Sequence, residues 1–269
     1  WPAGACRSLR ARARRVSGAS GKVGEDSPSS RPSLTLLGSE PLRAAVELAR
    51  HALTPNPPAA RKGDGHTVIV FPGLGSDGLA LAPLRNYCNA LGYHALDWQM
   101  GRNTGPEGDI DAWMRRLADH TAGLLKPFRK RATLIGWSLG GLYAREVAKL
   151  LTPRVRQVIT IGTPFNWTDD HTNIAWLVRL LKGDAASIDE ALSARLRKPP
   201  MVPTTSLYSR ADGVVAWQSC RHGRRRKNVE DVEIEGSHLG MGWNQTVMRV
   251  VADRLAQAPR RWRPLRQVA

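Results

Sequence analysis

A short apolar run leads into a serine framed by glycines and continues as a helical pattern, in Ala132-Thr-Leu-Ile-Gly-Trp-Ser-Leu-Gly-Gly-Leu. In G-x-S-x-G between a strand and a helix, the turn is so tight that Cβ atoms at Gly136 and Gly140 would clash. The turn lifts the hydroxyl above the sheet, and the first free N–H groups of the helix point at any negative charge formed beside it. Ser138 is therefore predicted to be a nucleophile; a purely structural turn is the alternative.

A second glycine-rich loop, Pro72-Gly-Leu-Gly-Ser-Asp-Gly, follows the run Thr67-Val-Ile-Val-Phe, which is typical of a fully buried parallel strand. When a serine attacks an acyl carbon, the carbonyl oxygen becomes an oxyanion and needs a second N–H donor from such a loop. The backbone N–H groups of Leu74 and Leu139 are predicted to form this oxyanion hole. The alternative is an ordinary glycine-rich turn between a strand and a helix.

Strand and helix patterns alternate along the rest of the chain. Segments read as strands at 93–98, 155–162, 203–209 and 229–235 alternate with helical patterns at 80–91, 110–128 and 247–255. This alternation predicts an α/β fold, a three-layer sandwich with a mostly parallel sheet covered by helices on both faces. We assign residues 63–258 to this single domain. An insertion at 166–200 carries two helical patterns and is predicted to form a small helical cap over the site; an ordinary surface excursion is the alternative.

An aspartate and a histidine follow two successive predicted strands. Asp212 lies in Ser-Arg-Ala-Asp-Gly-Val-Val, and His238 lies in Gly-Ser-His-Leu-Gly-Met. Because parallel strands end at the same edge of a sheet, both side chains should reach Ser138. The histidine would take the serine proton, and the aspartate would fix its tautomer. Asp169 and Asp170 are an alternative source of the acid.

Several tryptophans stand where the walls of a pocket are built. Trp137 is next to the predicted nucleophile, and Trp167, Trp217 and Trp243 follow predicted strand ends. Their rings are predicted to line a pocket for an apolar acyl group, with plain packing as the alternative for each ring. This chemistry needs no metal and no cofactor. Three scattered cysteines without a C-x-x-C pair indicate neither a disulfide framework nor a zinc site.

The formal net charge of +17 is unevenly distributed. Residues 1–62 hold 11 Lys and Arg against 4 acids, residues 63–209 hold 17 against 13, and residues 210–269 hold 12 against 6. The excess lies mainly at the two ends, so binding of a specific nucleic acid is not predicted. The basic run 221–227 and the ends predict at most a weak association with an anionic membrane surface, or contact with a phosphate-bearing substrate. A cytoplasmic protein, with peripheral membrane contact as an option, is expected.

The N-terminal segment divides into two parts. Residues 1–33 hold too few apolar side chains to pack and are predicted to be a disordered basic tail, and residues 259–269 are predicted to be a basic C-terminal tail. Because the chain begins with Trp1, its natural start is expected upstream. Residues 34–62 are predicted to form a helix and a linker. The helix should begin at the N-cap Ser39, with Pro41 in its first turn, and pack its apolar face on the domain. That face comprises Leu42, Val46, Ala49 and Leu53.

Four segments between Gly65 and Gln257 resemble the lipase/esterase-like bacterial branch of the α/β-hydrolase superfamily: F-P-G-L-G-S-D, L-G-Y-x-x-x-x-W-x-x-G-R-N-x-G-P, G-W-S-L-G-G and S-R-x-D-G-V-V. Pro72 stands where many lipases have the histidine of a His-Gly pair. The resemblance implies the α/β-hydrolase fold and a serine hydrolase that cleaves carboxylic esters by a Ser-His-Asp triad and an acyl-enzyme. One alternative is an acyltransferase or thioesterase acting on an anionic acyl carrier. Another alternative is a basic binding protein on an inactive hydrolase scaffold. The retention of all three triad candidates argues against it.

Overall fold

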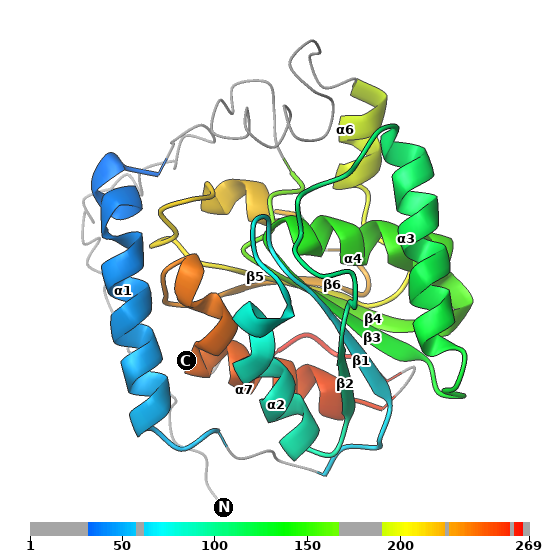
Figure 1. The fold of residues 1–269 in the computed structure, drawn as a ribbon, viewed down its shortest axis with the longest axis horizontal. Coiled ribbons are helices and arrows are strands. Elements are labelled where there is room, and N and C mark those ends of the chain that lie inside the picture. The colour runs from blue at the N-terminus through cyan, green and yellow to red at the C-terminus, as the bar shows by residue number, and fades with distance from the viewer. Residues whose placement is uncertain (1–31, 58–61, 167–189, 224–225, 259–260, 266–269) are drawn as a thin grey trace, which may run out of the picture.

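The computed structural model describes residues 32–57, 62–166, 190–223, 226–258 and 261–265 (Figure 1). At its centre is a six-stranded sheet in the order β2-β1-β3-β4-β5-β6, and each pair of neighbouring strands is parallel. The strands are β1 (Thr67–Phe71), β2 (His94–Asp97), β3 (Ala132–Trp137), β4 (Val155–Ile161), β5 (Thr204–Tyr208) and β6 (Val229–Glu233). The predicted alternation and the parallel sheet are confirmed.

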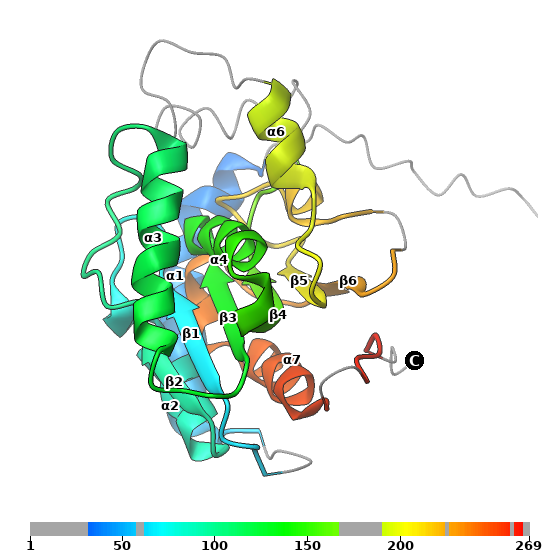
Figure 2. The ribbon, with the colours of Figure 1, turned by 90° about the vertical axis from the view of Figure 1, so that its right-hand side faces the viewer.

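Helices cover both faces of the sheet (Figure 2). One face packs against α3 (Ile110–Leu125), α4 (Leu139–Leu150) and α6 (Glu190–Arg197), and the other against α2 (Ala82–Ala90) and α7 (Gln245–Ala256). Short 3₁₀ turns are η1 (Gly78–Leu81), η2 (Thr152–Arg154), η4 (Trp217–Cys220) and η5 (Leu239–Trp243). Alternate residues of β1 enter the two cores, Ile69 on the α3/α4 side and Val70 on the α2/α7 side. The three-layer prediction is confirmed.

Helix α1 (Leu34–Leu53) begins earlier than predicted. Its N-cap is Ser33, whose side chain accepts a hydrogen bond from the Leu36 N–H, so the predicted N-cap at Ser39 is wrong. Pro41 consequently lies inside the helix and not in its first turn. The earlier start adds a turn that reaches the loop after β5.

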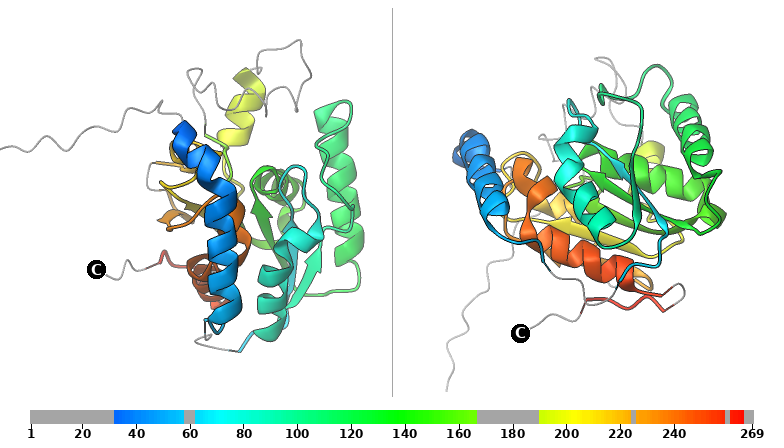
Figure 3. Two further views of the ribbon diagram at one scale, coloured as in Figure 1. Left: turned by 60° about the vertical axis from the view of Figure 1, so that its left-hand side comes forward. Right: turned by 60° about the horizontal axis from the view of Figure 1, so that its bottom comes forward.

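The predicted inward face of α1 is also wrong. Leu42 and Leu53 are 71% and 86% exposed, and the buried residues of the helix are Glu40 and Ala44. Figure 3 shows α1 along the outside of the domain, where it packs against η5. Polar side chains face inward because the surface they meet consists of loops whose backbone N–H and C=O groups need partners.

Some predictions concern segments outside the described residues. These segments include the basic tail at 1–31, most of the cap insertion at 167–189, and residues 266–269. The weak association with an anionic membrane surface therefore stays a prediction. Within the described part of the chain, no helix combines the length and apolar character that crossing a bilayer requires.

Helix α6 matches the second helical pattern of the insertion, and its Leu192 and Leu196 join the core under α4.

Candidate active site

Ser138 stands at the carboxyl edge of the sheet, on the turn between β3 and α4. Its φ of 55° and ψ of −125° lie in a region that residues with a Cβ rarely adopt, so the turn is strained. A Cβ on Gly136 would stand 2.2 Å from the carbonyl oxygen of Gly140, and a Cβ on Gly140 would stand 2.3 Å from that of Phe71. The close approach of α4 to β1 and β3 accounts for both glycines.

The loop after β1 lies against this turn. A Cβ on Gly73 would stand 3.2 Å from the Cβ of Ser138. Leu139 is the first residue of α4, so its N–H has no acceptor within the helix. Among the described residues, none accepts a hydrogen bond from the Leu139 N–H or from the Leu74 N–H. Both predicted donors therefore remain available to a ligand beside Ser138.

Asn103 holds this loop from behind and was not identified from the sequence. Its fully buried side chain donates from Nδ2 to the Pro72 carbonyl at 2.8 Å and accepts from the Tyr143 hydroxyl at 3.2 Å. Its backbone accepts from Gly75 and donates to Ser76, both at 2.7 Å. The G-R-N-x-G-P segment was the available signal, because a polar side chain embedded in a glycine-rich loop usually fixes the loop's shape.

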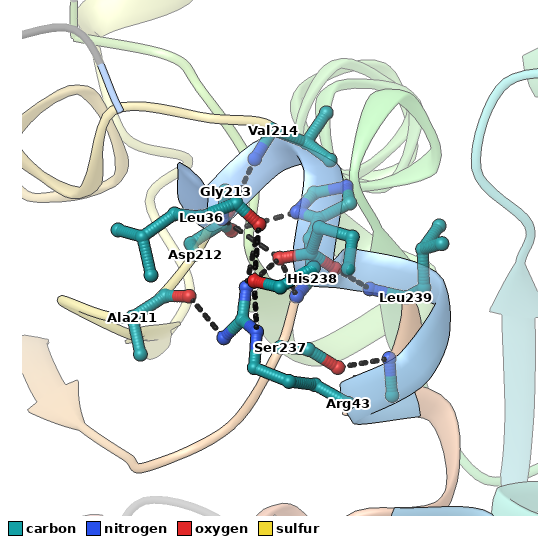
Figure 4. Close-up of polar contacts among 12 residues, drawn as sticks. Leu36, Arg43, Ala211, Asp212, Gly213, Val214, Ser237, His238 and Leu239 are labelled. Atoms are coloured by element: carbon teal, nitrogen blue, oxygen red, sulfur yellow. Dashed lines mark hydrogen bonds and ion pairs between the residues drawn. The ribbon is translucent and has the colours of Figure 1, made fainter. Parts of the chain in front are cut away.

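Asp212 and His238 meet at the same edge, from the loops after β5 and β6 (Figure 4). His238 Nδ1 lies 2.7 Å from Asp212 Oδ2, and the two side chains are 3% and 1% exposed. Asp212 Oδ1 accepts the N–H groups of Val214 at 2.8 Å and Val215 at 2.7 Å. The aspartate is thus fixed by its own loop and directs its second oxygen at the imidazole. Nε2 is then the ring nitrogen that can take a proton from a neighbouring hydroxyl.

The His238 ring lies beside the serine turn. Trp137 donates from its indole Nε1 to the His238 carbonyl at 3.1 Å, and the two ring centroids are 5.6 Å apart. At the end of β4, a Cβ on Gly162 would stand 3.1 Å from His238 Nδ1. The preceding residue, Ile161, accepts the Ser138 N–H at 2.8 Å. His238 and Ser138 therefore both lie near the end of β4, although among the described residues the Ser138 hydroxyl has no hydrogen bond to His238 Nε2.

The surroundings of His238 change its proton affinity. Burial alone would lower the pKa of the imidazole, because it disfavours the charged form. The charge and the hydrogen bond of Asp212 raise that pKa, and the charge of Glu40 raises it further. The net result is a pKa above the usual 6.5. The imidazole is therefore mostly neutral, and able to accept a proton, only at a pH above this raised pKa.

Two of the predicted pocket tryptophans have packing contacts elsewhere. Trp243 donates from its indole to the Ala44 carbonyl of α1 at 3.2 Å. Trp217 stacks on Tyr208 with centroids 5.6 Å apart, and the Arg210 guanidinium lies 4.1 Å from the Trp217 centroid. These contacts are those expected under the packing alternative for both rings.

The pocket role of Trp137, Trp217 and Trp243 stays a prediction. Trp167 and the alternative acids Asp169 and Asp170 lie outside the described residues. Within the described ranges, no three or more His, Cys, Asp or Glu side chains form a group that could hold a metal ion. The arrangement described above offers hydroxyl, imidazole and carboxylate chemistry.

A second Asp-His-hydroxyl arrangement lies at the opposite edge of the sheet. His66 Nδ1 is 2.5 Å from Asp64 Oδ1, and His66 Nε2 is 2.9 Å from the Thr133 hydroxyl. Arg156 donates to the other oxygen of Asp64 at 2.7 Å. Thr133 is fully buried within β3, and burial lowers the pKa of His66. Because no turn exposes the Thr133 hydroxyl, this arrangement ties the strand ends together.

Comparisons with known proteins match most of the chain to one family. A family model described as "Alpha/beta hydrolase family" matches residues 68–268. A pimeloyl-[acyl-carrier protein] methyl ester esterase of Shewanella woodyi is 28% identical over 102 residues, which are 38% of this chain and only 37% of that protein.

Two solved structures show the shared fold. Lipase B of Aspergillus fumigatus has a TM-score of 0.56 and 18% identity over 75% of this chain and 56% of that chain. The mature lipase of Bacillus licheniformis has a TM-score of 0.54 and 16% identity over 74% of this chain and 96% of that chain.

Proposed function

The chain belongs to the alpha/beta hydrolase family, and from that membership we propose that it is a serine hydrolase that cleaves carboxylic esters with a fairly apolar acyl group. The observation that carries this proposal is the buried Asp212–His238 pair beside the strained turn at Ser138. The test is labelling with a fluorophosphonate, followed by peptide mass spectrometry. We expect the adduct on Ser138.

In the proposed reaction, His238 Nε2 removes the Ser138 proton as the serine oxygen attacks the ester carbonyl carbon. The N–H groups of Leu74 and Leu139 donate to the oxyanion that forms. The bond from the carbonyl carbon to the alcohol oxygen then breaks, and the imidazolium returns the proton to that oxygen. Water, deprotonated by the same histidine, attacks the acyl-enzyme and releases the acid. Asp212 stabilises the imidazolium in both halves of the reaction.

The raised pKa of His238 predicts the pH dependence of the reaction. The histidine acts as a base only when neutral, so kcat/KM on a neutral ester should rise with pH. Its midpoint should lie above 6.5, because Asp212 and Glu40 favour the protonated form. The measurement is a pH profile of kcat/KM between about pH 5 and 9. A midpoint below 6.5 would contradict the assigned surroundings of the base.

A second candidate function is supported by a cavity of about 380 Å³ between α6 and the segment before β6. The described residues that line the cavity include the cations Arg197, Lys198 and Arg226. No acidic residue is among the described lining residues. This candidate is the hydrolysis of an acyl group attached to an anionic carrier. The Shewanella woodyi relative is, by its name, an esterase for a carrier-bound methyl ester.

A buried cation lies under this cavity. Arg145 is fully buried, and its guanidinium carbon lies 3.8 Å from the ring centroid of the lining residue Phe165. It donates to His222 Nε2 at 3.0 Å, so that nitrogen is an acceptor, and His222 Nδ1 donates to Asp231 at 3.0 Å. Burial lowers the pKa of Arg145. A phosphate or carboxylate in the cavity would offset the cost of this buried charge.

Removing two of the lining cations should test this candidate. In the double variant Lys198→Ala, Arg226→Ala, kcat/KM for an acyl-coenzyme A thioester should fall about tenfold, because charge-assisted contacts to phosphate are lost. The value for a neutral short-chain ester should not change. Lys227→Ala, an exposed lysine outside the lining, is the matched control. An equal loss on both substrates, or no loss on the thioester, would exclude the carrier function.

A further inference from the structure

Glu40 of α1 places a buried carboxylate between the two loops that carry Asp212 and His238. Its side chain is 2% exposed. Oε1 accepts the N–H of Gly213 at 2.7 Å and the N–H of His238 at 3.0 Å. Oε2 accepts the N–H of Leu239 at 3.0 Å. One carboxylate therefore binds the backbone of the predicted base, of the residue after it, and of the residue after the predicted acid.

Further contacts hold the carboxylate in this position. Arg43, one turn along α1, donates to Glu40 Oε1 at 2.8 Å and to the Ala211 carbonyl at 2.6 Å. A Cβ on Gly213 would stand 2.5 Å from the Leu36 carbonyl oxygen, so a glycine is needed for the loop to come this close to α1. The helix and the loop after β5 thus pack backbone against backbone.

The loop after β6 is fixed to the same helix at a second point. Glu47, two turns after Glu40, accepts the Ser237 N–H at 2.8 Å through Oε1. A Cβ on Gly240 would meet Glu47 Oε2, so a larger residue there would displace this carboxylate. Four charged groups therefore lie around the His238 loop. Asp212 comes from the loop after β5, and Glu40, Arg43 and Glu47 come from α1.

We propose that Glu40 is a positioning residue of the hydrolase site: it holds the His238 loop and the Asp212 loop in place relative to each other. Its helix, α1, precedes residues 68–268, which the family model matches. This inference rests on the proposed function. Glu40 acts on the reaction through the backbone of His238 and not through contact with substrate. A displacement of about 1 Å in a catalytic group can cost on the order of 100-fold in rate, so removing the anchor of the base should be visible in kcat.

The test is Glu40→Gln in the full chain. The amide keeps the size of the side chain, but its NH₂ group opposes one of the backbone donors, so the His238 loop should shift. We expect kcat on a neutral ester to fall about 10- to 100-fold with little change in KM, and the rate of fluorophosphonate labelling to fall by a similar factor. The midpoint of the kcat/KM profile should move to lower pH, because the charge of Glu40 raises the pKa of His238.

The matched control is Glu230→Gln. Glu230 is a glutamate with a side chain only 7% exposed. It accepts from the Thr205 hydroxyl at 2.7 Å, from Arg254 at 2.5 Å and from the Leu265 N–H at 2.6 Å, and none of these donors lies in the loops of the site. Its loss should lower the Tm without moving the pH profile. If Glu40→Gln behaves in the same way, its role is structural only and the inference fails.

Two further outcomes separate the inference from the proposed function. If the wild-type protein is not labelled at Ser138, the proposed function itself fails. If the wild-type protein and Glu40→Gln are labelled at Ser138 at equal rates, only the positioning role fails. Should Glu40→Gln not fold, Glu40→Asp keeps the charge and withdraws the carboxylate by one methylene. It should then lower kcat without moving the midpoint, and an unchanged kcat would overturn the inference.

Discussion

Ser138→Ala is expected to abolish fluorophosphonate labelling and to lower the turnover of a short-chain ester by several powers of ten, on the order of 10⁴- to 10⁶-fold. The loss is large because the nucleophile, the base and the acid act as a unit, and only the oxyanion donors and substrate binding remain without the hydroxyl. Steady-state kinetics and intact-protein mass spectrometry measure the two effects. The substitution removes one oxygen from a nearly buried side chain, so circular dichroism should not change.

The same experiment distinguishes the enzyme from the binding-protein alternative. A basic binding protein on an inactive scaffold would show neither hydrolysis nor labelling in the wild-type chain. Labelling that persists in Ser138→Ala would identify another serine and would overturn the assignment of the nucleophile. Loss of labelling together with loss of folded structure would require repetition with Ser138→Gly, which also lacks the hydroxyl and has no Cβ strain at φ of 55°.

Asp212→Asn is expected to lower kcat by on the order of 10⁴-fold. The amide can be oriented with its NH₂ toward His238 Nδ1, which favours the wrong tautomer, and it no longer stabilises the imidazolium. The hydrogen bonds from Val214 and Val215 to Oδ1 can persist, so the loop should keep its shape. Kinetics at saturating ester measure the effect, and thermal unfolding shows whether the fold is retained.

Asp64→Asn offers a matched control for this prediction. Asp64 forms the same kind of pair with His66, at the opposite edge of the sheet. Its substitution should lower the Tm, because the contact with Arg156 is weakened, and should leave turnover within about twofold, as expected for a site away from the chemistry. If Asp64→Asn or Asp169→Asn proved as damaging to kcat as Asp212→Asn, the assignment of the acid would be wrong.

The central sheet could be predicted from the sequence for a simple physical reason. The central parallel strands are buried on both faces, so they are nearly continuous apolar runs, as in Thr67–Phe71. The glycines at 136 and 140 are detectable because a strand-turn-helix connection this tight leaves no room for a Cβ. Asp212 and His238 could be identified as candidates because each comes directly after one of two successive strands. Chain order and strand direction together brought these side chains to one edge.

Helix α1 could not be predicted in the same way. Amphipathic patterning assumes that the apolar face of a helix is the buried face. Here the contact surface is loop backbone, which is satisfied by carboxylates and guanidinium groups, so the buried face carries Glu40, Arg43 and Glu47. The remaining signal was the spacing of these charges at three and four residues, which puts them on one side of a helix. That spacing is equally typical of a solvated face, and only the fold distinguishes the two.

The hydrogen bond from His238 to Glu40 joins residues 198 positions apart. Contacts of such separation form late, because the chain entropy lost in closing them is recovered only once the intervening segments have packed. During synthesis α1 leaves the ribosome long before the strand and loop that it binds, and it has no docking partner through most of translation. Helix content and the packing of the sheet can therefore develop while the base still lacks its anchor. On a refolding time course, turnover should be the last property to return.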